Sequence, residues 1–151
     1  MYERILVPVD GSATSMRGLE EAVRVAQLTH ARLRLIHVVD ELPLAMSAGT
    51  VSSYADGLLA SRERGEAVLE DAQARADAAG IPADTVLRDT LQGRVCELVI
   101  KEADSWHADL IVIGSHGRRG ARRAVMGSNA EQILRVAPVP VLVVRGAPGE
   151  R

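Results

Sequence analysis

The sequence predicts an α/β fold in which an open parallel β-sheet carries helices on both faces. Five short apolar runs recur along the chain, and longer stretches with helical periodicity lie between them. Regular alternation of strand and helix is typical of right-handed crossovers, which build parallel sheets. Four of the five runs are apolar on both faces, as expected of strands covered by helices on both sides.

The expected strands are residues 4–10, 33–40, 84–90, 109–115 and 139–146. The third run differs from the others because polar and apolar residues alternate along it. Val86 and Arg88 face one way, and Thr85 and Leu87 face the other. This alternation predicts an edge strand.

Three helices are predicted by apolar residues at spacings i, i+3, i+4 and i+7. The three sets are Leu19, Ala22, Val23 and Ala26; Cys96, Val99, Ile100 and Ala103; and Ala130, Ile133, Leu134 and Ala137. A longer helix is expected over about residues 58–79, ended by Gly80 and Pro82. Residues 40–57 are interpreted as a long connection, either a lid over a site or a mobile surface loop.

Length and composition indicate one domain, residues 1–145, followed by a disordered tail at 146–151. A net charge of −2, two Tyr, one Trp and no Phe argue against a nucleic-acid partner. No apolar run approaches the ~20 residues that a membrane helix needs. The single cysteine, Cys96, excludes an intrachain disulfide, and a cytoplasmic location is expected.

Small and polar residues follow several of the expected strands. Asp10 ends the first strand, Asp40 ends the second, and Gly114 lies near the end of the fourth. Ligands of open parallel sheets lie beyond the carboxyl ends of the strands, where the strand order reverses. A binding crevice is therefore predicted at this edge of the sheet.

The stretch from the end of the fourth strand to the last helix contains Gly114, Gly117 and Gly127. Ser128 and Glu131 have the spacing of a capping box, with Ser128 as the expected N-cap. The start of a helix offers unpaired amides and a partial positive charge, so an anion such as phosphate is favoured there. The stretch is neither a P-loop nor a dinucleotide fingerprint, because the required Lys and glycine spacing are absent.

The segments "ILVPVDGS", "IHVVD", "ADLIVIGSHGRRG", "MGSNAEQIL" and "APVPVLVVR" resemble those of universal stress proteins over nearly the whole chain. Residues 114–128 also match the pattern G-x2-G-x9-G-[ST] of the ATP-binding subgroup. The resemblance implies a Rossmann-like sheet of order 3-2-1-4-5, as in adenine nucleotide α hydrolases. It also implies bound ATP with Mg²⁺, and a homodimer formed through the strand at 139–145.

By this resemblance, Pro8, Val9 and Asp10 line the nucleoside end, with Asp10 meeting the ribose or a metal. Val38 is expected to contact adenine through its backbone. The expected phosphate-binding residues are Gly114, Gly117, Gly127, Ser128 and Asn129.

Other residues are open to two interpretations. Arg118, Arg119, Arg122 and Arg123 could close over a triphosphate or form an ordinary solvated loop. Buried His37 and Cys96 are expected to be core residues, whereas His30 and His107 are expected at surface or helix-end positions. No catalytic role is assigned to His116.

The resulting hypothesis is an ATP-binding regulatory homodimer with at most slow hydrolysis. The alternatives are an interaction dimer that uses no nucleotide and, less favoured, an AMP-forming ligase.

Overall fold

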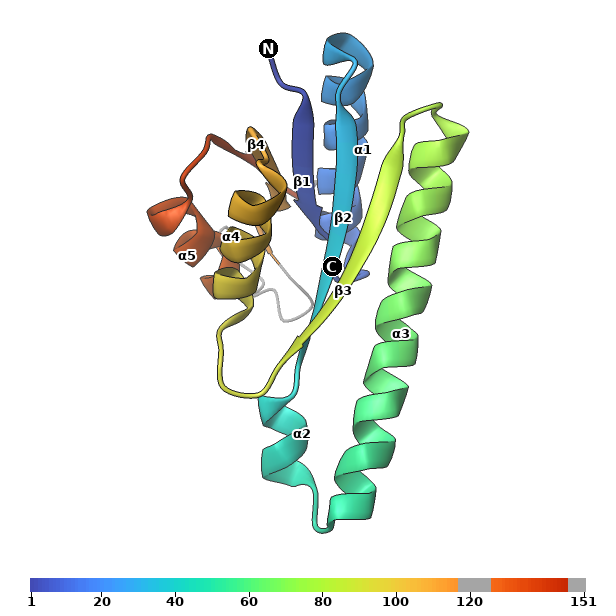
Figure 1. Ribbon diagram of the computed structural model, residues 1–151, viewed down its shortest axis with the longest axis vertical. Helices are drawn as coiled ribbons and strands as arrows, with labels where there is room; N and C mark the ends of the chain where they lie inside the picture. Colours follow the sequence, from blue (N-terminus) through green and yellow to red (C-terminus); the bar gives the residue numbers. More distant parts are fainter. Residues whose placement is uncertain (117–125, 147–151) are drawn as a thin grey trace.

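The computed structural model describes residues 1–116 and 126–146. Five parallel strands form one sheet of order β3-β2-β1-β4-β5 (Figure 1). The strands are β1 (Arg4–Pro8), β2 (Arg32–Asp40), β3 (Ala83–Thr90), β4 (Leu110–Gly114) and β5 (Val141–Val144). The predicted fold class, the strand order and the edge position of β3 are confirmed.

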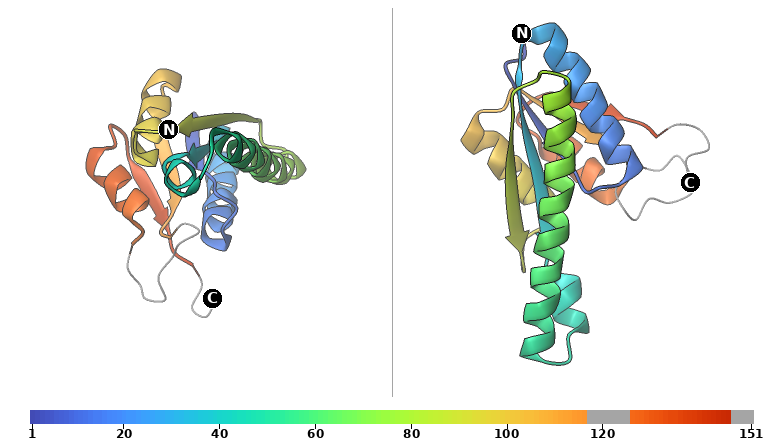
Figure 2. Two further views of the ribbon diagram at one scale, coloured as in Figure 1. Left: turned by 90° about the horizontal axis from the view of Figure 1, so that it is seen from below. Right: turned by 90° about the vertical axis from the view of Figure 1, so that its right-hand side faces the viewer.

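Five helices accompany this sheet in the described part of the chain. They are α1 (Ala13–Thr29), α2 (Leu42–Ser47), α3 (Val51–Ala78), α4 (Val95–Trp106) and α5 (Ser128–Val136). Helices α1 and α3 cover one face, and α4 and α5 cover the other (Figure 2). Helices α1, α2, α4 and α5 each come after a strand, so the start of each of these four lies near the carboxyl edge of the sheet.

The central strand β1 shows why the sheet is buried on both faces. Ile5 and Val7 belong to the apolar cluster under α1 and α3, whereas Leu6 belongs to the cluster under α4 and α5. All three side chains are fully buried. Successive side chains of a strand point to opposite faces, so a continuous apolar run satisfies both layers.

The region expected to be a long connection is helical instead. Helix α2 occupies Leu42–Ser47, and α3 begins at Val51, seven residues earlier than the predicted start near 58. Thr50 is the N-cap of α3, and its side-chain oxygen accepts a hydrogen bond from the Ser53 amide at 3.0 Å. Together α2 and the first part of α3 project beyond the carboxyl ends of the strands (Figures 1 and 2).

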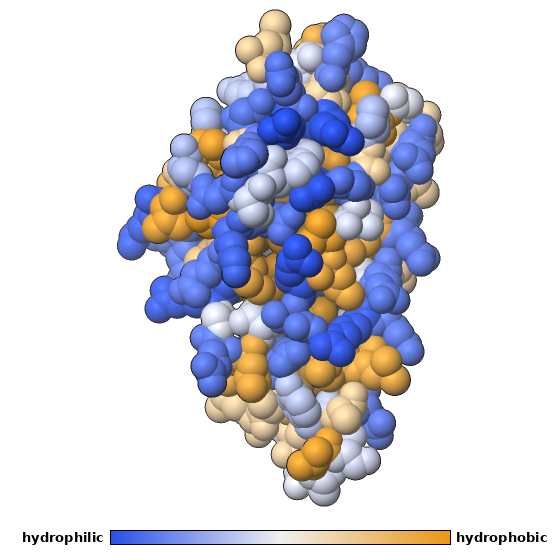
Figure 3. All heavy atoms as spheres, viewed as in Figure 1, coloured by the Kyte–Doolittle hydropathy of each residue, from blue (hydrophilic) through white to orange (hydrophobic). Residues whose placement is uncertain are grey.

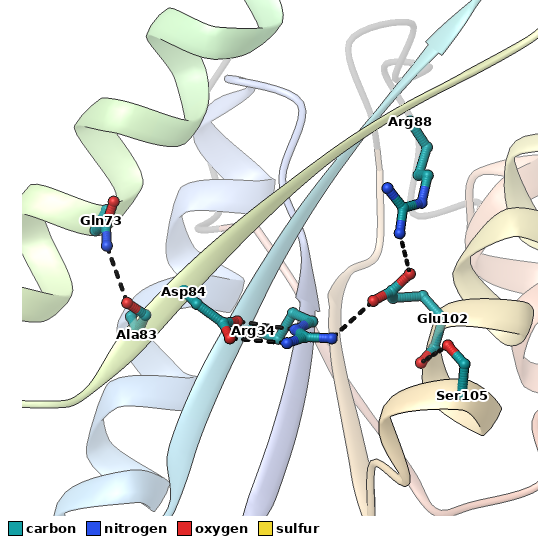
Figure 4. A network of polar contacts seen from close by, with 7 residues as sticks. All are labelled: Arg34, Gln73, Ala83, Asp84, Arg88, Glu102 and Ser105. Atoms are coloured by element: carbon teal, nitrogen blue, oxygen red, sulfur yellow. Dashed lines mark hydrogen bonds and ion pairs between the residues drawn. The ribbon is translucent and has the colours of Figure 1, made fainter.

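An ion-pair network lies between β2, β3 and α4 (Figure 4). Arg34 donates two hydrogen bonds to the Asp84 carboxylate, both 2.8 Å long, and a third of 2.9 Å to Glu102. Arg88 donates to the other Glu102 oxygen at 3.2 Å. The Arg34 guanidinium also stacks 4.7 Å from the ring centroid of Trp106. This network links the edge strand β3 and its neighbour β2 to α4.

Several interpretations of single residues are also confirmed. His30 and His107 end α1 and α4 in the left-handed conformation, with φ of 60° and 57°. Cys96 is buried, and its Sγ donates to Gln132 Oε1 at 3.0 Å. Burial raises the pKa of this thiol, as expected of an unreactive core cysteine. No described helix is long and apolar enough to cross a membrane.

Candidate functional site

The turn that follows β1 is closed by its own polar side chains. The Ser12 amide donates to Asp10 Oδ1 at 2.9 Å, and Gly11 adopts a φ of +81°. Ser12 then caps α1, because its hydroxyl accepts from the Ser15 amide at 3.1 Å. Asp10 is half-buried, at the carboxyl edge of the sheet where the sequence places it. It closes the turn, and Ser12 is the residue that caps the helix.

The end of β4 lies against the first turn of α1. A Cβ at Gly114 would lie 2.6 Å from the Thr14 carbonyl oxygen and 2.7 Å from its carbonyl carbon. One turn further along α1, a Cβ at Gly18 would lie 3.1 Å from the Gly114 amide nitrogen. Both glycines therefore let helix and strand backbones approach closely. The close packing of α1 on β4 therefore explains why position 114 is a glycine, whether or not a ligand binds there.

The start of α5 is tied to the end of β4. The Gly127 amide donates to the Ser115 carbonyl at 2.7 Å, and the Ser115 amide donates to the Val144 carbonyl at 2.8 Å. Gly127 is the N-cap residue of α5, and no side chain caps this helix. The predicted capping box is therefore wrong. Ser128 is the first helical residue, and Ser128 and Asn129 are both exposed.

Two helix N-termini thus flank the carboxyl ends of the paired strands β1 and β4. Helix α1 enters from one face of the sheet and α5 from the other. The strand order reverses between β1 and β4. The strands β1, β2 and β3 follow one another toward one edge of the sheet, whereas β4 and β5 follow one another toward the other edge. The first amides of a helix have no intrahelical acceptor, and each N-terminus carries about half a positive charge. The arrangement favours a negatively charged ligand.

The β1–β2 side of the site is fixed by the backbone and by one histidine. The Val9 amide donates to the Ile36 carbonyl at 2.9 Å. The Val9 carbonyl in turn lies 2.8 Å from Nδ1 of buried His37. Pro8 pairs with Ile36 in the strand register, so Asp10 and Val38 lie near each other two residues further on. The core role predicted for His37 is confirmed.

His116 carries a signal that the sequence did not reveal. Its Nδ1 lies 2.9 Å from the Ser115 hydroxyl oxygen. Among residues 1–116 and 126–146, its Nε2 is the one buried side-chain nitrogen or oxygen without a hydrogen-bond partner. Such atoms in folded proteins usually indicate a partner that is not yet in place.

The structure brings together eight of the nine residues expected at the site. Pro8, Val9, Asp10 and Val38 lie on the β1–β2 side, and Gly114, Gly127, Ser128 and Asn129 lie on the β4–α5 side. Gly117 and the four arginines between 118 and 123 lie outside the described residues. No group of three His, Cys, Asp or Glu side chains suited to a metal occurs in the described part of the chain. Asp10 is thus not part of a group of three such side chains among the described residues.

Comparison with known proteins gives consistent results. The sequence model of the universal stress protein family matches residues 1–145. A universal stress protein of Methanocaldococcus jannaschii is 32% identical over 146 residues, which cover 96% of this chain and 83% of that protein. A solved structure of a family member from Burkholderia pseudomallei is 33% identical, with a TM-score of 0.75 over 95% of this chain and 96% of that one. A universal stress protein solved in complex with cAMP is 25% identical, with a TM-score of 0.66 over 97% and 98% of the two chains.

Proposed function

The chain belongs to the universal stress protein family, and from this premise we propose that it is an ATP-binding regulatory protein. The observation that carries the proposal is that α1 and α5 both begin beyond the carboxyl ends of the paired strands β1 and β4, on opposite faces of the sheet. A similar protein has been solved with cAMP, which supports an adenine nucleotide as the ligand class.

The phosphates are assigned to the start of α5. The Ser128 and Asn129 amides come before the first intrahelical bond, which runs from the Glu131 amide to the Gly127 carbonyl at 3.0 Å. The Gly127 amide is already used by Ser115, so Gly127 contributes room for the phosphates and not its own N–H. The unpartnered Nε2 of His116 is a further candidate to meet a phosphate oxygen. Gly114 and Gly117 are assigned to the phosphates as well, as the sequence resemblance implies.

The nucleoside end is assigned to Pro8, Val9 and Asp10, with Val38 offering its backbone to adenine. Asp10 would meet the ribose hydroxyls or share Mg²⁺ with the phosphates. Mg²⁺ fits this donor set, because it binds through one or two carboxylates together with phosphates and water. When bound, Mg²⁺ would offset phosphate charge.

Binding without rapid turnover is part of the proposal. The Asp10 oxygen Oδ1 accepts a hydrogen bond from the Ser12 amide, so this oxygen helps to hold the turn and is not placed to orient an attacking group. A phosphoryl-transfer site needs a residue that orients the attacking group. We therefore expect at most slow hydrolysis, in a protein of the cytoplasm, where ATP is available.

A homodimer through strand 139–145 completes the proposal. Strand β5 is at the end of the sheet, and all four of its apolar residues are half-buried in the single chain. Edge strands of this kind readily pair with another chain. Light scattering should give twice the mass of one chain, and a strictly monomeric mass at high protein concentration would contradict the dimer.

The test of nucleotide binding uses the charge at the start of α5. We expect Ser128→Glu to keep or slightly raise thermal stability, because a negative charge in the first turn favours the helix. The same charge should repel the phosphates, so ATP affinity measured by calorimetry with Mg²⁺ should fall at least tenfold. Ser128→Ala is the matched control, and it should be as stable as the parent because Ser128 is not the N-cap.

Comparison of the heats of ATP binding of the parent and the two variants decides whether the nucleotide binds at the start of α5. Equal heats of ATP binding in the parent and Ser128→Glu would place the nucleotide elsewhere. No heat in any variant at millimolar ATP, and no nucleotide released from the purified protein, would favour the alternative of an interaction dimer that uses no nucleotide.

A further inference from the structure

Strand β2 continues past the end of its neighbour β1. Pairing of β2 with β1 ends at Ile36, whereas its pairing with β3 continues to Asp40. The last bond of the β1–β2 ladder runs from the Val9 amide to the Ile36 carbonyl at 2.9 Å. The Asp10 amide then donates to the Ser15 hydroxyl at 3.2 Å, so the chain turns out of the sheet after Val9.

The backbone of Val38 points toward the space that β1 leaves. In a parallel sheet the N–H and C=O of one residue point to the same neighbouring strand, and successive residues alternate between the two neighbours. Even-numbered residues of β2 face β1, since the Arg32 amide donates to the Glu3 carbonyl at 2.9 Å. Odd-numbered residues face β3, since the Leu33 amide donates to the Pro82 carbonyl at 2.8 Å. The amide and carbonyl of Val38 therefore lie on the β1 side.

His37 interrupts the ladder at this point. A regular ladder would continue with a bond from the Val38 amide to the Val9 carbonyl. The His37 ring is bonded to that carbonyl instead, with Nδ1 2.8 Å from the oxygen. A carbonyl oxygen only accepts, so Nδ1 carries the hydrogen and donates it. In the described part of the chain the Val38 amide has no backbone acceptor on this side, so it is available to a ligand.

The His37 ring is held in place by packing. The ring is buried, and a Cβ at Gly65 would lie only 2.6 Å from its Cδ2, so α3 rests directly on it. Leu87 is the partner of His37 in the β2–β3 register, and its Cδ1 would lie 2.9 Å from the same Cβ. Because the ring is enclosed in this way, the separation of Val9 from Val38 is part of the fold before any ligand binds.

The end of β2 is also open to a ligand. Val38 is half-buried, at the margin of the apolar cluster under α4 and α5. On this face, apolar side chains lie over β2 and β3 with hydrophilic residues around them (Figure 3). This part of the strand therefore offers an aromatic base apolar contacts beside free backbone groups.

We propose that His37 is a positioning residue that holds β1 and β2 apart beyond Val9, so that the Val38 amide and carbonyl select adenine over guanine. This inference rests on the proposed function, nucleotide binding at this edge of the sheet. Adenine presents an acceptor at N1 and an amino donor at N6, which match an N–H and a C=O. Guanine presents a donor at N1 and an acceptor at O6, so both backbone groups would be left unpaired.

Amide hydrogen exchange, followed by NMR without nucleotide, tests the positioning role. In the parent the Val38 amide should exchange faster than the Glu41 amide, which is bonded to the Thr90 carbonyl at 2.8 Å. His37→Leu removes the donor, so the Val38 amide should close on the Val9 carbonyl and its exchange should slow by about tenfold. His37→Asn keeps an N–H donor near the position of Nδ1, so its Val38 amide should exchange as in the parent.

Base selectivity is the second readout. In calorimetry with Mg²⁺ the parent should bind ATP about tenfold more tightly than GTP. In His37→Leu the affinity for ATP should fall toward that for GTP, because the phosphates still bind but the base loses its partners. Leu87→Ala is the matched packing control. It opens space beside the ring and leaves Nδ1 in place, so stability should fall while the preference for ATP is kept.

The outcomes separate this inference from the proposed function. Equal exchange of the Val38 amide in the parent and His37→Leu would overturn the inference, and so would equal ATP-to-GTP affinity ratios in a parent that binds ATP. No heat with either nucleotide in the parent would refute the proposed function, and the adenine preference with it. If His37→Leu does not fold, the parent alone decides, because ATP should slow exchange of the Val38 amide and GTP should not. Equal slowing by both nucleotides would overturn the inference.

Discussion

Gly65 lies where α3 crosses the sheet, and its replacement by alanine has a calculable effect. A Cβ at this position would lie 2.6 Å from His37 Cδ2, 2.9 Å from Leu87 Cδ1 and 3.1 Å from His37 Nε2. His37 cannot easily move away, because its Nδ1 is bonded to the Val9 carbonyl at 2.8 Å. Overpacking of this kind costs about 1–3 kcal/mol. Alanine regains up to about 1 kcal/mol of helix propensity.

We therefore expect Gly65→Ala to lower the free energy of unfolding by about 1–2 kcal/mol. For a chain of this length that corresponds to a fall in Tm of roughly 2–8 °C, measurable by calorimetry or circular dichroism. Because the displaced ring holds the Val9 carbonyl at the candidate site, nucleotide affinity should fall in the same variant.

Gly57→Ala is the matched control on the same helix. Its new Cβ would meet only the flexible end of Leu44, at 3.1 Å, so the propensity gain should leave this variant as stable as the parent or more so. Combining Gly65→Ala with His37→Ala should cost less than the sum of the two changes, because the second removes the clash. Equal stability of Gly65→Ala and Gly57→Ala would refute the reasoning.

Two further predictions concern polar networks. Glu102→Ala should cost about 2 kcal/mol in chemical denaturation, since Arg34 loses one buried partner but keeps Asp84; an unchanged midpoint would show that the contact contributes nothing. The hydrogen bond to Glu41 raises the pKa of Tyr54 above 10.0, so the stability it contributes is complete below pH 10 and declines as the pH rises through the raised pKa. An ultraviolet absorbance titration should show Tyr54 ionising at a raised pH, and Glu41→Gln should lower that pH. Identical titration curves for the parent and the variant would contradict this.

The layered fold could be predicted because its signals are local and repeated. Buried strands require continuous apolar runs, and docked helices require an apolar stripe, and both are visible in one sequence. The prediction failed over residues 40–57 for the same reason. The first part of α3 does not dock on the sheet, so it lacks the inward stripe that reveals the helix from about residue 58. The sequence sign of an earlier start was Thr50, a residue type favoured at the N-cap position that it takes in the structure.

The carboxyl edge of the sheet could be located from the sequence, but the local geometry of the candidate site could not. Loop ends at the carboxyl edge of a parallel sheet can be located from the strands alone. The cap of α5 could not, because Gly127 takes that position through its bond to Ser115, a contact between residues distant in sequence. The packing of Gly114 against Thr14 was equally invisible, since it depends on the angle at which α1 crosses β4. Which residues contact a nucleotide stays a prediction.

The stacking of Trp106 on Arg34 determines what intrinsic fluorescence can report. Trp106 is the only tryptophan, and it ends α4 near the amino edge of the sheet, opposite the proposed nucleotide crevice. The fluorescence of Trp106 should change when the contacts of Arg34 are disrupted. It should change little when a ligand binds at the carboxyl edge of the sheet. Optical binding experiments on this chain therefore need a labelled nucleotide or a second indole introduced beside the crevice.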